Sequence, residues 1–426
     1  MKIAIVGYGI EGRSNYSYFM SRGDVTIVDE NSQLEGIQSG AKTLLGKGVF
    51  KRLEDFDLVV RTAGVAPYKI ETKGKIWSAT NEFFARCPAP IIGVTGSKGK
   101  GTTCSFIKSI LHEAGMTVHL IGNIGVPALD VLDDIASDKE VVVYELSSFQ
   151  LWDVKRSPQV AVLLKIEPDH LDVHIDFEEY VSAKSNITRY QTSQDTIIYD
   201  ISNKYTHTIA QASLAQRVPY QSQESAHVSN GMFWYGEQKL CSIETMHLPG
   251  LHNQDNACAA IDAAWIFTQD KDAIRRGLSA FTGLPHRLKF VRNVNDVDYY
   301  DDSLATTPGS AIAAMKAFTQ PKIMIFGGSS KGGDFNSVAE TAAKSNVKAA
   351  IVIGGEADKI STLLETCGIN VINLGTTMTM DEIVRVAQEQ TIAGDVVILS
   401  PAYASFGMFK DYSDRGNRFI AAVNSL

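Results

Sequence analysis

The sequence predicts an α/β protein of three domains, with an N-terminal Rossmann-like domain, a central P-loop ATPase-like domain built on a parallel sheet, and a C-terminal Rossmann-like α/β domain. Short runs of aliphatic and β-branched residues alternate with helical stretches, which is typical of parallel sheets covered by helices on both faces. Glycine-containing turns follow several of these runs. The 426 residues also exceed what one hydrophobic core usually serves. We place the domains at 1–89, 90–284 and 285–426.

The composition excludes several classes of protein. With 44% hydrophobic and 21% charged residues and a net charge of −8, the chain lacks the basic footprint of a nucleic-acid-binding protein. No apolar stretch reaches the roughly 18 residues of a membrane span, and residues 1–12 lack the long apolar region of a signal peptide. The five cysteines form no CxxC pair, so we interpret them as buried small apolar residues in a reduced compartment. We expect a cytoplasmic protein with no nucleic-acid or membrane partner.

The first block is predicted to be a βαβ unit with a glycine turn. Residues 2–6 are predicted as a strand, followed by the turn Gly-Tyr-Gly-Ile-Glu-Gly at 7–12, a helix to residue 22 and a strand at 25–29. Asp29 lies about 17 residues after the last glycine, near the spacing of a dinucleotide fingerprint. The same geometry holds any diphosphate, so the pattern predicts a pyrophosphate cradle. An NAD-dependent oxidoreductase is the alternative.

The second block opens with a predicted phosphate-binding loop. Residues 93–103 read Gly-Val-Thr-Gly-Ser-Lys-Gly-Lys-Gly-Thr-Thr, between an apolar run at 90–92 and an amphipathic stretch at 104–111. Three glycines let the backbone N–H groups point inward, Lys100 can reach the outer phosphates, and a following hydroxyl can hold Mg²⁺. The segment predicts a nucleoside triphosphate site, with a Gly/Ser-rich surface turn as the alternative.

The residue after Lys100 departs from the usual loop pattern. It is Gly101, where Ser or Thr is usual, so the metal-binding hydroxyl must come from Thr102 or Thr103. The glycine is tolerable if the first helical turn begins one residue later, because it adds backbone freedom and no charge.

Polar residues end two further apolar strands of the second block. The runs at 141–144 and 161–166 lead into Glu145 and into Glu-Pro-Asp-His at 167–170. Ligands collect at the carboxyl ends of parallel strands, so we expect Glu145 and His170 to face the same crevice as the phosphate loop. The alternatives are an exposed acid for Glu145 and a satisfied structural histidine for His170.

A helix is predicted from Asp176, with Asp176 as N-cap and Glu179 as the reaching acid of a capping box. Tyr180, Lys184 and Ile187 share one face, which would aim the lysine inward if that face is apolar. Lysine is seldom buried, so a solvated Lys184 is favoured on the sequence alone.

The third block alternates apolar strands with helices. We predict its strands at 322–326, 349–353, 371–374 and 396–399, with the sharpest turns at 327–331 and 400–402. It is another α/β domain, whose loops could close over the central one. The polar stretch at 195–239 contains short strand-like pieces and carries no functional signal.

Six segments together resemble the Mur ligases. They are Gly-Val-Thr-Gly-Ser-Lys-Gly-Lys from 93, Tyr-Glu-Leu-Ser-Ser-Phe-Gln-Leu from 144, Glu-Pro-Asp-His-Leu-Asp from 167, Gly-Leu-His-Asn-Gln-Asp-Asn from 250, Leu-Pro-His-Arg from 284 and Asp-Ser-Leu-Ala-Thr from 302. Their order and spacing match across nearly the whole chain. Leu-Ser-Pro-Ala-Tyr-Ala-Ser-Phe from 399, with Arg-Gly from 415, is most similar to the family member that adds D-glutamate.

The resemblance implies an ATP-dependent ligase of peptidoglycan precursor synthesis. It would join D-glutamate to UDP-N-acetylmuramoyl-L-alanine through an acyl phosphate, as a monomer, with ATP and two Mg²⁺ ions. The three domains would bind the UDP-sugar, ATP and the amino acid in that order. The implied catalytic residues are Lys100, His170 and Lys184, and the implied metal site is Thr102, Glu145, His170 and Lys184, the lysine carrying a carbamate.

The resemblance also implies three sets of binding residues. The ATP contacts would be Gly96, Ser97, Lys98, Gly99, Lys100, Gly101, Thr102, Asn253, Asn256, Arg287 and Asp302. The contacts with the UDP-linked substrate would be Gly9, Ile10, Glu11, Asp29, Asn123 and Ser147. The amino-acid contacts would be Thr306, Lys331, Ser405 and Tyr412.

Some positions depart from the family pattern. Gly101 is closer to the related folylpolyglutamate ligases, which lack an N-terminal UDP-binding domain. Leu304 replaces the lysine of Asp-Ser-Lys-Ala-Thr, which removes a charge near the second substrate. Tyr412 lies where the D-glutamate enzyme tends to have phenylalanine, so its ring can still pack against the substrate. A sugar-nucleotide sensor without turnover is a further alternative to the ligase and the oxidoreductase. The joint presence of Lys100, Glu145, His170 and Lys184 argues against both alternatives.

Overall fold

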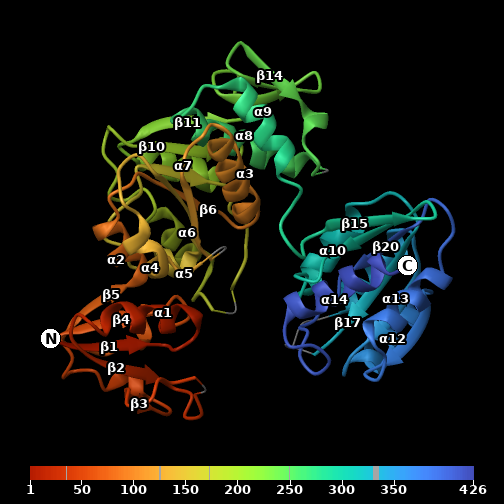
Figure 1. The fold of residues 1–426 in the computed structure, drawn as a ribbon, viewed down its shortest axis with the longest axis horizontal. Helices are drawn as coiled ribbons and strands as arrows, with labels where there is room; N and C mark the ends of the chain where they lie inside the picture. Colours follow the sequence, from red (N-terminus) through yellow and green to blue (C-terminus); the bar gives the residue numbers. More distant parts are fainter. Residues whose placement is uncertain (35, 124–125, 172, 249, 330–334) are drawn as a thin grey trace. The chain divides into compact units, whose positions relative to one another are not determined.

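The structure of the chain is a computed structural model that describes residues 1–34, 36–123, 126–171, 173–248, 250–329 and 335–426 (Figure 1). The described strands form three largely parallel sheets and one short antiparallel sheet, which confirms the predicted α/β class. The chain divides into two compact units. One unit is Met1–His247 with Leu251–Phe281, and the other is Leu248–Gly250 with Thr282–Leu426. The boundary predicted at residue 89 falls between two sheets of the first unit.

The first sheet has five parallel strands in the order β3-β2-β1-β4-β5. They are β1 (Lys2–Val6), β2 (Asp24–Asp29), β3 (Lys42–Leu45), β4 (Leu58–Arg61) and β5 (Lys75–Ser78). Alternate residues of β1 enter two cores, one shared with α1 (Ile10–Phe19) and α2 (Ala79–Arg86) and the other with the 3₁₀ segment η1 (Val49–Lys51). Because both faces are covered, the strand is apolar from Ile3 to Val6. The strands predicted at 2–6 and 25–29 are both present. A second 3₁₀ segment, η2 (Pro67–Lys69), lies between β4 and β5.

The second sheet has six parallel strands in the order β11-β10-β9-β6-β8-β7. They are β6 (Ile91–Thr95), β7 (Val118–Gly122), β8 (Val141–Glu145), β9 (Val160–Leu163), β10 (Thr196–Asp200) and β11 (Gln216–Tyr220). The helices packed against this sheet are α3 (Lys100–Glu113), α8 (Leu251–Trp265), α5 (Ser148–Leu151), α6 (Phe177–Ser185) and α7 (Lys204–Ala212). Outside them lie α9 (Lys271–Ala280), against α3, and α4 (Ala128–Val131) with η3 (Leu132–Asp134), against α1 and α2.

The strand predicted at 161–166 ends earlier, at Leu163. The following backbone turns to the phosphate loop, because Lys165 O accepts a hydrogen bond from Ser97 N at 3.0 Å. Sequence reasoning also missed a three-stranded antiparallel sheet in the polar stretch: β12 (Ala226–Ser229), β13 (Met232–Tyr235) and β14 (Gln238–Ser242), followed by η4 (Ile243–Thr245). The Tyr235 ring stacks on Trp265 of α8, with ring centroids 4.0 Å apart.

The sheet of the second unit has the order β15-β16-β20-β17-β18-β19, with only β15 antiparallel to its neighbour. Its strands are β15 (Lys289–Val294), β16 (Val297–Asp301), β17 (Lys322–Gly327), β18 (Val347–Ile353), β19 (Asn370–Gly375) and β20 (Val396–Leu399). One face packs on α10 (Pro308–Lys316), α11 (Asn336–Lys344) and α12 (Ala357–Thr366), and the other on α13 (Met380–Glu389) and α14 (Tyr412–Asn424). The four strands predicted for this block are confirmed.

An arginine joins the first two sheets. The side chain of Arg61, at the end of β4, is fully buried; its Nε donates to Asp153 Oδ2 at 2.9 Å and one Nη donates to Phe149 O at 3.0 Å. This contact could not be predicted from the sequence, because the two partners of Arg61 are about 90 residues away along the chain.

The cysteines are partly as expected. All five are free thiols, and Cys104, Cys241 and Cys258 are buried, but Cys87 and Cys367 are only partly buried because they lie at helix ends. Among the described residues, no helix combines the length and apolarity needed to cross a bilayer.

Candidate active site

The predicted phosphate loop lies between β6 and α3, and two of its glycines are required by the backbone. Gly96 and Gly99 have φ values of 153° and 86°. A Cβ on Gly96 would lie 2.6 Å from Leu164 Cβ, and one on Gly99 would lie 2.2 Å from Asn256 Oδ1. Both the positive φ and the lack of space exclude a side chain, which keeps the loop backbone accessible.

Ser97 fixes the middle of the loop. Its hydroxyl donates to Glu167 O at 2.7 Å and accepts from Glu167 N at 2.9 Å. The Tyr180 hydroxyl lies 2.8 Å from Ser97 Oγ and supplies a second proton to it. Burial raises the pKa of Tyr180 to about 12, which keeps that proton in place. Lys98 points outward instead and pairs with Asp169 at 3.1 Å.

Two lysine ammonium groups converge on one carbonyl of the loop. Lys100 Nζ donates to Gly96 O at 3.0 Å and to Ser97 O at 3.1 Å. Lys184 Nζ donates to the same Gly96 O at 2.8 Å and lies 3.3 Å from Thr95 Oγ1. The backbone oxygen carries only a partial charge, so this arrangement concentrates positive charge where phosphate oxygens would bind.

Lys184 is buried, so the expectation of a solvated lysine is wrong. The residue is 1% exposed, because Tyr180 and Ile187 on the same side of the segment are also buried against the sheet. Among the residues that the structure describes, no carboxylate forms an ion pair with it. Burial, and next the neighbouring Lys100 ammonium, hold the pKa of Lys184 well below its ordinary value.

Glu145 ends β8 and is only 5% exposed, so the alternative of an exposed acid is wrong. Its Oε1 accepts from Asn123 Nδ2 at 3.0 Å, and its backbone O accepts from Asn123 N at 3.1 Å. Besides the effect of burial, the negative charge of Glu145 raises the pKa of Lys184 and that of Cys104 in α3, whereas the positive charge of Lys100 lowers both pKa values. The structure therefore brings Glu145 to the phosphate loop, as predicted, and places Asn123 beside it.

The first turn of α3 supplies the hydroxyls. The helix begins at Lys100, so Gly101 lies within the first turn and the condition that the turn begins one residue later is not met. Thr103 is fully buried and donates to Asn256 Oδ1 at 3.4 Å. Asn256 Nδ2 in turn lies 3.3 Å from Asn253 Oδ1. Thr103 is thus hydrogen-bonded to α8, and the metal-binding hydroxyl of Thr102 stays a prediction.

His170 lies just beyond the loop, and its side chain is about 50% exposed. That exposure is too large for a buried structural histidine. Its backbone has a φ of 54°, in the left-handed region. Its Nε2 lies 4.0 Å from Asp169 Oδ2, and Asp169 also pairs with Lys98 of the loop.

The predicted capping box of α6 is only half present. Asp176 is the N-cap and accepts from Glu179 N at 2.8 Å, as expected. The Glu179 carboxylate does not return to Asp176 N. It accepts from Ile175 N and from Trp152 Nε1, each at 2.7 Å, and meets His174 Nδ1 at 3.2 Å. Three donors around the carboxylate explain the difference.

The predicted sugar-nucleotide residues lie at the carboxyl end of the first sheet. Gly9 is the N-cap of α1 and is exposed, as is Ile10 at 81%. Glu11 accepts from Ala63 N at 2.8 Å, and burial raises its pKa. Asp29 accepts from Tyr8 N and from Asn31 N, each at 2.8 Å. These bonds hold the turn after β1 in an open shape. Ser147, in the second sheet's domain, is the N-cap of α5 and forms a capping box with Gln150.

The remaining predicted residues belong to the second unit. Asp302 follows β16 and is 5% exposed; its Oδ1 accepts from Leu288 N at 3.1 Å and its Oδ2 from Ser400 Oγ at 2.7 Å. Burial raises the pKa of Asp302 to about 7. Arg287 is exposed nearby, and its charge lowers that pKa slightly against the effect of burial.

Two loops meet beside Ser405. Ser329 N donates to Ala404 O at 2.8 Å, and a Cβ on Gly328 would lie 2.0 Å from the same oxygen. Ser405 is 4% exposed, Thr306 is partly buried and Tyr412 is 42% exposed at the start of α14. Lys331 lies outside the described residues.

Sequence reasoning missed a buried scaffold under this edge of the sheet. His286 Nδ1 lies 2.6 Å from Asp301 Oδ2, and Arg415 donates to Ser303 O at 2.9 Å and to Tyr403 O at 3.2 Å. The quoted motifs Leu-Pro-His-Arg, Asp-Ser-Leu-Ala-Thr and Arg-Gly contain or adjoin these residues, and that was the available signal.

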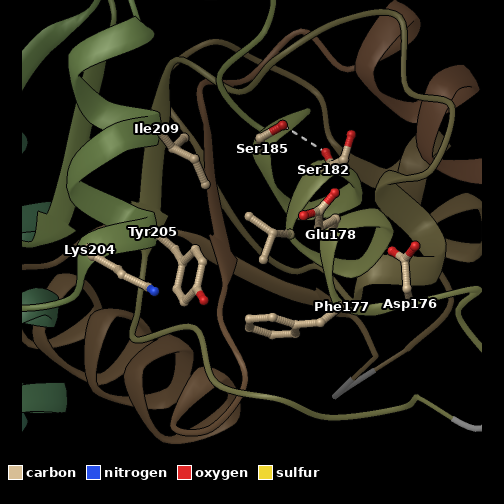
Figure 2. Close-up of a pocket in the computed structure, with 9 residues that line it drawn as sticks. Asp176, Phe177, Glu178, Ser182, Ser185, Lys204, Tyr205 and Ile209 are labelled. Atoms are coloured by element: carbon tan, nitrogen blue, oxygen red, sulfur yellow. Dashed lines mark hydrogen bonds between the residues drawn. The ribbon is translucent and has the colours of Figure 1, made fainter.

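An open groove of about 1010 Å³ lies between α6 and α7, away from these residues (Figure 2). Its lining residues are Asp176, Phe177, Glu178, Val181, Ser182, Ser185, Lys204, Tyr205 and Ile209. None of the predicted site residues is among them.

The described residues contain no cluster of three or more His, Cys, Asp or Glu side chains arranged for a metal ion. Mg²⁺ bound together with a nucleotide typically uses one or two carboxylates, phosphate oxygens and water. Glu145 and Thr102 are the residues predicted to hold one such ion. The fold and the loop thus define a phosphate-loop α/β protein.

Comparisons with known proteins show to which family of phosphate-loop α/β proteins the chain belongs. Residues 94–264 match the Mur ligase middle domain, and residues 286–403 match the Mur ligase, glutamate ligase domain. The UDP-N-acetylmuramoylalanine–D-glutamate ligase of Acetivibrio thermocellus is 38% identical over 100% of this chain and 96% of its own length. The enzyme of the same name from Clostridium tetani is 34% identical over 100% and 97%. The chain belongs to the Mur ligase family.

Solved structures agree on the fold. UDP-N-acetylmuramate-alanine ligase MurC from Thermotoga maritima aligns with a TM-score of 0.60 at 18% identity, over 100% of this chain and 99% of that one. MurF ligase from the same organism, in complex with ADP, aligns with a TM-score of 0.57 at 16% identity, over 100% and 94%.

Proposed function

We propose that this chain is an ATP-dependent ligase that joins D-glutamate to UDP-N-acetylmuramoyl-L-alanine in peptidoglycan precursor synthesis. The observation that carries the proposal is the convergence of Lys100, Lys184 and Glu145 on the phosphate loop at the carboxyl edge of one parallel sheet. Full-length similarity to D-glutamate ligases supports the choice of substrates.

The arrangement suits acyl activation. A carboxylate is a poor electrophile, so the γ-phosphoryl group of ATP is transferred to an oxygen of the alanyl carboxylate, which gives an acyl phosphate and ADP. The amine of D-glutamate then attacks the acyl carbon, inorganic phosphate leaves, and the nitrogen loses a proton as the amide forms. Lys100 stabilises the negative charge that develops on the transferred phosphoryl oxygens.

Thr102 and Glu145 would hold the first Mg²⁺, and His170 and Lys184 would hold a second. The ions would supply charge neutralisation at the phosphate oxygens. The buried position of Glu145 keeps its carboxylate in a site of low water content, where it interacts strongly with a cation.

Lys184 contributes to the metal site as a carbamate in this proposal. A buried lysine that contacts a carbonyl, a hydroxyl and a second lysine is poorly compensated as a cation. Its neutral amine adds to the carbon of CO₂ and releases a proton, and the resulting carbamate is an anion. The change from cation to anion removes the repulsion with Lys100 and creates oxygen ligands for Mg²⁺.

We assign the substrates to three domains at 1–89, 90–284 and 285–426. The open turn of Gly9, Ile10 and Glu11, with Asp29, would bind the UDP group, helped by Asn123 and Ser147 of the central domain. Asn253 and Asn256 lie against the phosphate loop and support its role in ATP binding, together with residues 96–102. Arg287 and Asp302 of the second unit are proposed as further ATP-binding residues.

The amino-acid site would lie in the third domain and contain Thr306, Lys331, Ser405 and Tyr412. Ser405 is buried next to Ala404, where the two loops are bonded, and in this proposal its hydroxyl would donate to the side-chain carboxylate. The ligase would act as a monomer in the cytoplasm; its five free thiols are compatible with a reduced compartment.

One assay tests the proposal against its alternatives. Phosphate release is measured with ATP, Mg²⁺, UDP-N-acetylmuramoyl-L-alanine and an amino acid, each omitted in turn. The proposal requires release only in the complete mixture and a preference for D-glutamate over L-glutamate, L-alanine and meso-diaminopimelate. Binding without turnover would support a sensor, and NAD reduction without ATP would support an oxidoreductase.

A preference for L-alanine or meso-diaminopimelate would assign the chain to a different activity within the family. That outcome would leave the ATP site of the proposal intact and overturn the amino-acid site.

A further inference from the structure

A chain of three hydrogen-bonding side chains, two of them buried and the third 23% exposed, lies close to His170 in the fold. Ser148 Oγ is 2.8 Å from His174 Nε2, and His174 Nδ1 is 3.2 Å from Glu179 Oε2. Ser148 and His174 are 2% and 3% exposed. These three residues, which we name the His174 triad, come from α5, from the segment before α6 and from α6 itself.

The hydrogen bonds fix the orientation of the His174 ring. The Glu179 carboxylate already accepts from Ile175 N and Trp152 Nε1, so it is held in place as an acceptor. His174 Nδ1 must therefore donate to it, and the neutral ring presents Nε2 as an acceptor for the Ser148 hydroxyl. With both ring nitrogens bonded, the imidazole cannot rotate without breaking two hydrogen bonds, of which the one with Ser148 is buried.

The ring of Phe149 packs against both His174 and His170 and so connects the two histidine rings. The His174 ring stacks on Phe149, with centroids 5.2 Å apart and an angle of 15° between the planes. The rings of Phe149 and His170 pack in an edge-on arrangement, with their centroids 5.1 Å apart. Phe149 follows Ser148 directly, so the triad controls both the backbone position and the packing of this ring.

The backbone oxygen of His170 is also bonded to the His174 segment. His170 O accepts from Val173 N at 3.1 Å and from His174 N at 3.0 Å. His170 adopts a φ of 54°, a region that costs a residue with a Cβ about 1–2 kcal/mol and needs support from its surroundings. Anchoring His174 at both ring nitrogens provides that support.

We propose that Ser148, His174 and Glu179 are positioning residues that hold the imidazole of His170 in its metal-binding orientation. The inference rests on the proposed function, in which His170 helps to hold the second Mg²⁺. A half-exposed histidine loses side-chain entropy when it binds a metal ion, and a fixed ring has already lost it. The triad therefore raises the affinity of the second metal site without contacting the ion or the substrates.

The test uses Ser148→Ala as the primary variant, because it removes one hydroxyl and leaves the His174 ring in place. Glu179→Gln and His174→Phe are the second and third variants; His174→Phe keeps an aromatic ring against Phe149 and removes both hydrogen bonds. His227→Phe is the matched control, since His227 is a partly buried histidine in β12, with Nδ1 3.1 Å from Ser225 O.

The primary readout is Mn²⁺ binding, measured by electron paramagnetic resonance on the full chain with a non-hydrolysable ATP analogue and UDP-N-acetylmuramoyl-L-alanine. We expect two bound ions in the wild type, and in Ser148→Ala a roughly tenfold weaker second site with the first site unchanged within about twofold. The control should match the wild type. In turnover assays, high Mg²⁺ should restore the kcat of Ser148→Ala, while the KM for D-glutamate stays constant.

Equal weakening of both metal sites, or an activity loss that Mg²⁺ does not restore, would show a general structural role and overturn the proposal. Unchanged metal binding in all three triad variants would overturn it as well. Failure of the proposed function is distinguishable, because the wild type itself would then release no phosphate in the complete mixture.

Discussion

Replacing Asp302 with asparagine tests whether a buried carboxylate makes the second unit less stable as pH rises. Asp302 is 5% exposed, and burial raises its pKa from 3.8 to about 7. A raised pKa means that the folded state holds its proton more tightly than the unfolded state. The free energy of unfolding therefore falls as pH rises between these two values and is constant above about 7.

The size of the effect follows from the two pKa values. One pKa unit is worth about 1.4 kcal/mol, so the ionised carboxylate costs the folded state about 4 kcal/mol at high pH. Between pH 5 and pH 8, about 2–3 kcal/mol of this cost is expected. Asparagine resembles the protonated acid, because its amide oxygen can accept from Leu288 N and its NH₂ group can donate to Ser400 Oγ.

The assay compares wild type and Asp302→Asn by scanning calorimetry and by hydrogen exchange of strands β16 and β20, at several pH values from 5 to 8. We expect the two proteins to differ least at pH 5 and the variant to become progressively more stable as pH rises. The difference between the two proteins cancels the titration of all other groups. A difference that is independent of pH, or one that grows toward low pH, would refute a raised pKa at Asp302.

Three further predictions concern activity. Lys100→Ala and Glu145→Ala should fold but lose more than tenfold in turnover at saturating Mg²⁺, a barrier increase above about 1.4 kcal/mol. The control Lys108→Ala, on the exposed side of α3, should keep wild-type turnover. Smaller losses of turnover in the Lys100 and Glu145 variants would disprove the roles of these residues. Lys184→Ala should be nearly inactive and regain activity with added acetate or formate, which replace the carbamate; full activity of the wild type after prolonged dialysis against carbon-dioxide-free buffer would contradict this. Lys331→Ala should raise the KM for D-glutamate strongly, because a substrate carboxylate would be left without its cation; an unchanged KM in steady-state kinetics would remove Lys331 from the amino-acid site.

The sequence by itself determined the elements that depend on local chemistry. Apolar runs with no polar alternation predicted strands covered on both faces, and β1, β17, β18 and β20 follow that pattern. The glycine loop before Lys100 was equally evident, because its backbone needs positive φ values at Gly96 and Gly99. Motif order along the chain was sufficient to indicate the family.

Only the tertiary structure decided the environments of the polar residues. Lysine is usually solvated, and the burial of Lys184 depends on a carbonyl that lies 88 positions earlier in the chain. The carboxylate of Glu179, predicted to close the capping box, instead accepts hydrogen bonds from Ile175, His174 and Trp152, since three donors outweigh one local hydrogen bond. The contacts of Arg61 and Asp302 likewise join distant segments. Local pattern fixes which residues become strands and turns, whereas burial and pKa depend on neighbours that only the folded chain brings together.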